Sequence, residues 1–124
     1  MPEASRERPE RHSVLHTFTA HVRARPEAVF AAVEARLDPG ALAPVPYLSD
    51  SDSLLIVTQG GWWYRGEYRV VPDDTGSTLE HVVMNVAQRG EKAALVAGRK
   101  VIVEAPLQFH DLVKSLRAEL ETPA

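Results

Sequence analysis

The sequence predicts an α+β fold in which an antiparallel β-sheet packs against a long C-terminal α-helix, with a short helix after the first strand. Three observations predict this class. Runs of alternating apolar and polar residues recur with turn residues between them, as in an antiparallel meander. A helical segment with proline at its start interrupts them early. The final apolar pattern, from Glu104 to Glu121, has helical spacing.

The composition fits one soluble domain with one hydrophobic core. The chain has 124 residues, of which 44% are hydrophobic and 25% are charged. Its net charge of -3 offers phosphate backbones no positive field, so nucleic acid is not an expected partner. The absence of cysteine excludes disulfides and thiolate ligands and fits a reducing cytoplasm, the expected location. No apolar run is long enough to span a bilayer.

The first twelve residues are expected to form a mobile N-terminal tail. They contain three Arg and three Glu, whose charges cancel, and few apolar side chains that could be buried. They also lack the apolar stretch of a secretory signal. The single folded domain is therefore expected to span residues 13–122.

The first strand is expected from Ser13 to Arg23. Val14, His16, Phe18, Ala20 and Val22 form the more apolar of its two faces, so His16 is expected to point inward. A helix follows from Pro26 to Leu37, with its apolar face formed by Val29, Phe30, Val33 and Leu37. The segment Ala41 to Asp52 is then expected to be an irregular connection.

Three strands of a meander are expected at Leu54–Gln59, Trp62–Val71 and Thr78–Ala87. Gly60-Gly61 and the Pro72–Gly76 segment supply the hairpin turns. In the middle strand one face carries Trp62, Tyr64, Gly66, Tyr68 and Val70, and the other carries Trp63, Arg65, Glu67, Arg69 and Val71. The aromatic face is the expected interior, while either face of the third strand could be interior.

A loop is expected from Gln88 to Lys92, followed by the closing helix. The apolar side of that helix consists of Leu107, Phe109, Leu112, Val113, Leu116 and Leu120. The helix is expected to begin at about Ala105 with Pro106 in its first turn, and the alternative is an earlier start with a bend at the proline.

The segment His16-Thr-Phe-Thr-Ala-His-Val-Arg-Ala-Arg-Pro-Glu-Ala-Val-Phe30 resembles the opening strand and Pro-x-x-Val/Leu-Phe pattern of the SRPBCC or START-like superfamily. Pro106 to Glu121 resembles the closing helix of this family, which includes polyketide cyclases and lipid-transfer domains. The resemblance covers roughly Val14 to Glu121. It implies a helix-grip fold, in which a curved sheet grips the C-terminal helix around a cavity that often holds an apolar ligand.

The chain departs from this family in having about four recognisable strands where six or seven are usual. Further strands could lie in the Ala41–Asp52 or Ala93–Val103 segments. Otherwise the sheet has exposed edges, and a second copy of the chain could cover one of them. A homodimer is therefore one expected partner arrangement.

A small apolar or aromatic ligand is the other expected partner, and nine residues are predicted to line its site. They are the apolar, aromatic and histidine side chains of the inner strand faces and closing helix: His16, Phe18, Trp62, Tyr64, Tyr68, His81, Phe109, Leu112 and Leu116. The alternative interpretation is that these side chains fill the core and leave no cavity.

The sequence contains no strong catalytic, metal or cofactor motif. His16 and His21 lie on opposite faces of one strand and cannot share a metal there. No carboxylate pair, Ser-centred elbow or phosphate loop has the required spacing, so no metal or cofactor is expected. Ligand binding is the leading hypothesis. The others are a polyketide-cyclase-like enzyme with His16 or His81 as base, and an interaction module that uses the Trp63 strand face or a sheet edge.

Overall fold

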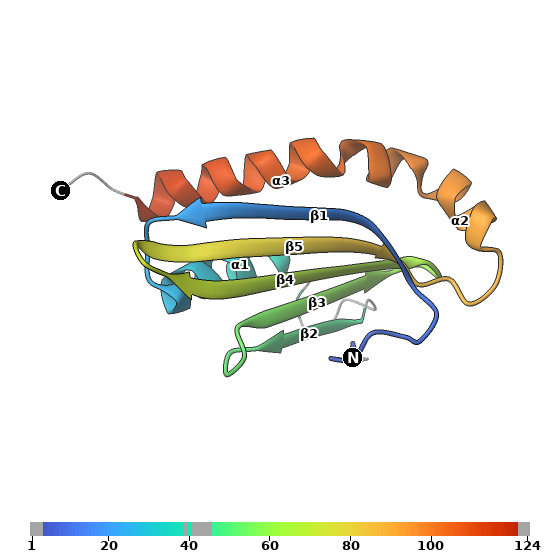
Figure 1. Cartoon of the computed structure of the whole chain (residues 1–124), viewed down its shortest axis with the longest axis horizontal. Coiled ribbons are helices and arrows are strands. Elements are labelled where there is room, and N and C mark those ends of the chain that lie inside the picture. The colour runs from blue at the N-terminus through green and yellow to red at the C-terminus, as the bar shows by residue number, and fades with distance from the viewer. Residues whose placement is uncertain (1–3, 39, 41–45, 122–124) are drawn as a thin grey trace.

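The computed structural model describes residues 4–38, 40 and 46–121. These residues form a five-stranded antiparallel sheet and three helices (Figure 1). The strands are β1 (Ser13–Val22), β2 (Tyr47–Asp50), β3 (Leu55–Gly60), β4 (Tyr64–Asp73) and β5 (Gly76–Asn85), and the helices are α1 (Pro26–Leu37), α2 (Glu91–Ala97) and α3 (Arg99–Leu120). The predicted α+β class is confirmed, including the short helix after the first strand and the long C-terminal helix.

Two segments expected to be irregular differ from the prediction. The described part of the Ala41–Asp52 connection contains the four-residue strand β2, and residues 41–45 lie outside the described part of the chain. Helix α2 begins at Glu91, inside the expected Gln88–Lys92 loop. Both elements are short, so neither carries enough repeats of an apolar pattern to be recognised in the sequence.

The strand order β1-β5-β4-β3-β2 places β1 and β2 at opposite edges. Strands β2 to β5 form a meander, and β1 pairs with β5. Helix α1 therefore carries the chain from one edge to the other. Helices α1 and α3 share a core with the inner sheet face, formed by Val22, Val29, Phe30, Ala32, Val33, Ile56, Val70, Leu79, Phe109, Val113 and Leu116.

The strand register aligns aromatic residues in a row across this inner face. Phe18 of β1 lies opposite His81 of β5, which lies opposite Tyr68 of β4. In the next row His16, Val83 and Gly66 are aligned in the same way. Because directly opposite residues of antiparallel strands share a face, the register brings these side chains together beneath α3.

The outer face of the sheet, opposite the helices, carries a buried charged cluster. Arg65 is 0% exposed and Glu67 is 7% exposed, and the Arg65 Nε donates to the Glu67 carboxylate at 3.0 Å. Arg8 donates to the same carboxylate at 2.8 Å. Burial raises the pKa of Glu67, but the hydrogen bonds from Arg8 and Arg65 outweigh it, so the net shift is downward. The single carboxylate therefore accepts hydrogen bonds from two guanidinium groups.

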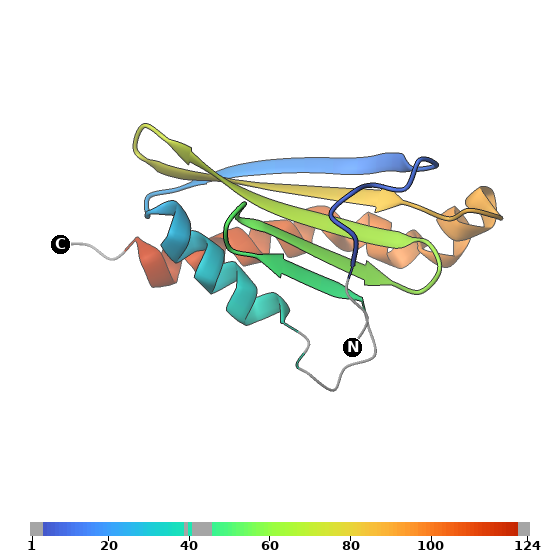
Figure 2. The same ribbon diagram turned by 90° about the horizontal axis from the view of Figure 1, so that it is seen from below.

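Residues of the N-terminal segment cover this cluster. Arg65 donates to the carbonyls of Ser5 and Arg6, and Ala4 is 3% exposed against Leu48 and Val57. Figure 2 shows the segment crossing the sheet on the side away from α3. The segment was expected to have nothing to bury. In the structure it buries Ala4, and its backbone carbonyls cover Arg65. Its mobility stays a prediction.

The two adjacent tryptophans lie opposite to the sequence prediction. Trp62 is 53% exposed, whereas Trp63 is 8% exposed and packs with Ala87 and Ala94. The physical reason is that the Gly60-Gly61 turn extends through both tryptophans and β4 begins only at Tyr64, so strand alternation does not apply to them. Of the expected outer surface, Trp63, Arg65 and Glu67 are buried, whereas Arg69 is exposed.

Helix α3 is continuous through Pro106 and begins at Arg99, earlier than the expected Ala105. Proline has no N–H, so the carbonyl of Ile102, four residues earlier, loses its usual helical donor. The His16 Nε2 lies 2.9 Å from that oxygen. Since a carbonyl only accepts, Nε2 carries the hydrogen and donates it. His16 points inward as predicted, and it replaces the missing helical hydrogen bond.

Candidate functional site

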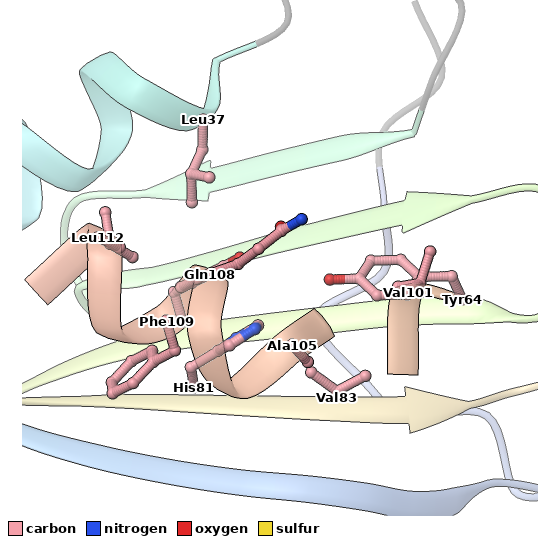
Figure 3. A pocket seen from close by; sticks show the side chains of 10 residues that line it. Leu37, Tyr64, His81, Val83, Val101, Ala105, Gln108, Phe109 and Leu112 are labelled. Carbon is pink, nitrogen blue, oxygen red and sulfur yellow. The ribbon is translucent and has the colours of Figure 1, made fainter. Parts of the chain in front are cut away.

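A cavity of about 150 Å³ lies between the inner face of β4 and β5 and the first half of α3 (Figure 3). Its walls combine aliphatic and aromatic side chains with a few polar groups. The lining residues are Leu37, Tyr64, Tyr68, His81, Val83, Val101, Ala105, Gln108, Phe109 and Leu112. This composition, largely apolar with a few convergent polar atoms, is typical of small-molecule sites.

Secondary structure brings these residues to one place. Val101, Ala105, Gln108, Phe109 and Leu112 recur at the three- and four-residue spacing that gives one face of α3. The facing wall comes from the two central strands, through the pairing of β4 with β5 described above. Leu37 closes one side from the end of α1. The site is therefore built on regular elements.

Aromatic stacking fills the space beside the cavity. His81 stacks on Tyr68 with ring centroids 3.9 Å apart and an interplanar angle of 9°. Phe109 lies 5.9 Å from His81 and 5.1 Å from Phe18 by the same measure. The helix thus presses directly on the aromatic row at Phe109. One turn earlier it presents Ala105, whose small side chain leaves the space open.

Gly66 contributes to the same space from β4. A Cβ at this position would overlap the Tyr64 hydroxyl and lie 3.0 Å from the Thr58 Oγ1. The glycine therefore lets the Tyr64 ring fold along its own strand, with the hydroxyl directed toward the cavity as Figure 3 shows. A side chain at position 66 would displace the phenol ring.

Burial keeps His81 neutral. The side chain is 6% exposed, and this burial is the main cause that lowers the pKa of His81 to about 4. The hydrogen bond to the Glu67 carbonyl opposes the shift, and the electrostatic effect of His16 adds to it. The Nδ1 lies 3.0 Å from the Glu67 carbonyl oxygen. Since that oxygen only accepts, Nδ1 carries the single hydrogen of the neutral ring. The Nε2 is consequently an acceptor.

The two tyrosine hydroxyls are coupled to each other. Burial raises the pKa of Tyr64, while hydrogen bonds with Thr58 and Tyr68 oppose that shift. Burial also raises the pKa of Tyr68, and the neighbouring Tyr64 adds to the rise. Both phenols are therefore neutral at physiological pH.

The structure brings together five of the nine residues predicted to form the ligand site. Tyr64, Tyr68, His81, Phe109 and Leu112 line the cavity. Phe18 and Leu116 belong to the core beside it, where Leu116 is 0% exposed.

The other two predicted residues lie elsewhere. His16 bonds to the α3 backbone. Trp62 is exposed at the turn, so its placement in the site was wrong for the reason given above.

Five lining residues were not predicted. They are the small, aliphatic and amide side chains Leu37, Val83, Val101, Ala105 and Gln108. The helical spacing of the three α3 residues was the available signal, since Ala105 lies four residues before Phe109, Gln108 four before Leu112, and Val101 four before Ala105. This spacing could be applied to Val101 only if the helix were known to continue through Pro106.

Other site classes find no support in the described part of the chain. Among residues 4–38, 40 and 46–121, no three His, Asp or Glu side chains are grouped so that they could hold a metal ion. No helix in these ranges has the length and apolar character needed to cross a membrane. Comparison with known protein families, curated proteins and solved structures found no match.

Proposed function

We propose that the protein binds a small aromatic ligand in the cavity between β4, β5 and α3. The observation that carries this proposal is the cavity itself, an apolar space of about 150 Å³ bordered by stacked rings. An apolar cavity of roughly this size accommodates one benzene ring. It is smaller than the roughly 300–1,000 Å³ of drug-sized pockets, so the expected ligand has a single ring.

A shallower groove next to the cavity offers room for a substituent. It measures about 410 Å³ and shares Tyr64, Val101 and Gln108 with the cavity. Trp63 and the Gly60-Gly61 turn form its other walls. Val101 is 46% exposed at the boundary between the two spaces. A ring in the cavity could therefore carry an apolar tail that leaves along the groove toward solvent.

A titration of toluene into ¹⁵N-labelled protein tests the proposal. A ligand of seven non-hydrogen atoms in a complementary site is expected to bind with a Kd on the order of 0.1–1 mM. Saturable shifts should centre on the amides of β4, β5 and the first half of α3. Shifts that stay linear with concentration, or that spread evenly over the surface, would contradict a specific site.

A variant that fills the cavity sharpens the test. Ala105→Phe places a ring in the space, so toluene binding should fall at least tenfold. Val103→Phe is the matched control, because Val103 lies on the same helix but is 68% exposed. The control should bind toluene like the wild type. Equal binding by both variants would place the toluene site elsewhere.

An enzymatic role for the same cavity is the second candidate, since His81 lines it beside two tyrosines. A histidine whose pKa is lowered to about 4 is a weak base at neutral pH. Binding is therefore the function that the site supports better. The START-like relationship, the polyketide-cyclase activity and the homodimer stay predictions, and sedimentation at micromolar concentration would test the last.

A further inference from the structure

The hydrogen-bonding state of His81 leaves one acceptor directed at the ligand space. Its Nδ1 hydrogen is committed to the Glu67 carbonyl on the neighbouring strand. Within the part of the chain that the structure describes, Nδ1 makes the one hydrogen bond of the His81 ring, and Nε2 receives none. Figure 3 shows the ring extending from β5 toward Gln108, with its edge in the cavity. Stacking on Tyr68 fixes the plane in which this lone pair lies.

The remaining polar groups of the wall are neutral. Tyr64 and Tyr68 contribute phenol hydroxyls that keep their protons, because burial raises the pKa of both. Gln108 lies on the helix side, 27 positions along the chain from His81 and across the cavity from it. The described lining includes no Lys, Arg, Asp or Glu. A charged ligand would therefore lose its hydration without gaining a counter-charge, which is costly.

We propose that the cavity selects a neutral aromatic ring bearing a hydroxyl group, a simple phenol, whose O–H donates to the Nε2 of His81. This inference rests on the proposed function, because it needs the ring to occupy the cavity. It adds the chemical class of ligand. The ring packs against Val83, Ala105 and the edge of Phe109, and the hydroxyl donates to an acceptor that an all-carbon ring would cover without giving it a partner.

The same geometry favours phenol over its close analogues. Toluene has the same shape but no hydrogen-bond donor, so it would displace water from Nε2 without replacing the hydrogen bond that the water makes. Benzoate carries a charge that the described lining cannot neutralise. The ratio of phenol affinity to toluene affinity should be about tenfold higher than in a cavity that lacks the acceptor. Benzoate should not bind detectably.

Parallel titrations of phenol and toluene at neutral pH test the inference. The quantity measured is the ratio of the two affinities, in the wild type and in His81→Phe, which keeps a stacked ring but removes the acceptor. The ratio should fall about tenfold in this variant. His110→Phe is the control, because His110 is exposed on α3 away from the cavity, and its ratio should equal that of the wild type.

A second measurement needs no variant. Histidine-ring ¹H–¹⁵N correlation spectra of the wild type report the tautomer, which should be Nδ1–H for His81. Phenol should shift the Nε2 resonance and toluene should leave it nearly unchanged. An unchanged ratio in His81→Phe together with an unmoved Nε2 resonance would overturn the phenol assignment while toluene binding upheld the proposed function. Failure of both rings to bind would refute the proposed function itself.

Discussion

Lowering the pH from about 7.5 to about 5 should destabilise the protein through His81. Its ordinary pKa of 6.5 falls to about 4 in the folded state. Above about pH 6.5 the ring is neutral in the folded and the unfolded state, so the lowered pKa of the folded state then costs no stability. Below that value the unfolded chain binds a proton that the folded chain does not, so the free energy of unfolding falls with the pH.

The magnitude follows from the two pKa values of His81. A shift from 6.5 to about 4 corresponds to about 3 kcal/mol once the pH is below both values. At about pH 5 the expected loss is about 2 kcal/mol relative to neutral pH. This is a large part of the roughly 5–15 kcal/mol by which domains are stable. Burial of the ring is the main cause, and it also keeps Nε2 an acceptor.

Urea denaturation of the wild type and of His81→Phe at both pH values measures the effect. The difference between the two proteins cancels the titration of the other histidines. The lowered carboxyl pKa values, such as that of Asp50 at about 2, contribute mainly below this pH window. The variant should lose about 2 kcal/mol less stability than the wild type. Identical pH dependence would refute the reasoning, because it would mean that folded His81 accepts a proton readily.

Three further substitutions test the packing around the site. Gly66→Ala should lower the free energy of unfolding, measured by urea denaturation, by about 1–3 kcal/mol, because the new methyl group overlaps the Tyr64 hydroxyl. Gly60→Ala is the control: its methyl group meets only an ordinary contact at 3.9 Å, so it should lower that free energy by less than about 1 kcal/mol. Arg65→Met should cost about 3 kcal/mol by the same assay, since it leaves a buried carboxylate with one fewer partner, and a cost below 1 kcal/mol would contradict that role. In a double-mutant cycle, His16→Phe should cost about 1 kcal/mol less in a Pro106→Ala background, where the helix regains its own donor, and additive costs would contradict the link.

The larger elements could be predicted because their patterns repeat many times. Ten-residue strands and a helix of 22 residues give alternation and helical spacing several chances to appear. The predicted helix from Pro26 to Leu37 has the observed bounds. The inner positions of Tyr64 and Tyr68 followed from alternation within β4. Two residues earlier the same rule failed at Trp62, because alternation holds only where the backbone is extended.

The cavity could be predicted only in part, because a void depends on side chains that are small or absent. Tyr68 and Phe109 were recognisable as large inward residues, whereas the interior face of the strand that carries His81 stayed open. Ala105 and Gly66, whose small size leaves the space between them, were expected at the helix start and on the inner strand face but were not placed in the predicted site. The buried state of Arg65 escaped prediction for a related reason. Its cover consists mainly of backbone carbonyls of the N-terminal segment, and carbonyls are present at every residue.

The two histidines of the inner face show why the site needed three-dimensional evidence. In the sequence, His16 and His81 were alternative candidates for a base, with His16 expected to point inward and the face of His81 left open. Pro106 removes one N–H from α3, and the freed carbonyl engages the Nε2 of His16. The strand carbonyl of Glu67 instead engages the Nδ1 of His81, so that ring presents its Nε2 to the cavity. Opposite ring nitrogens are therefore engaged. His16 fastens the helix to the sheet, whereas the Nε2 of His81 receives no hydrogen bond within the described part of the chain.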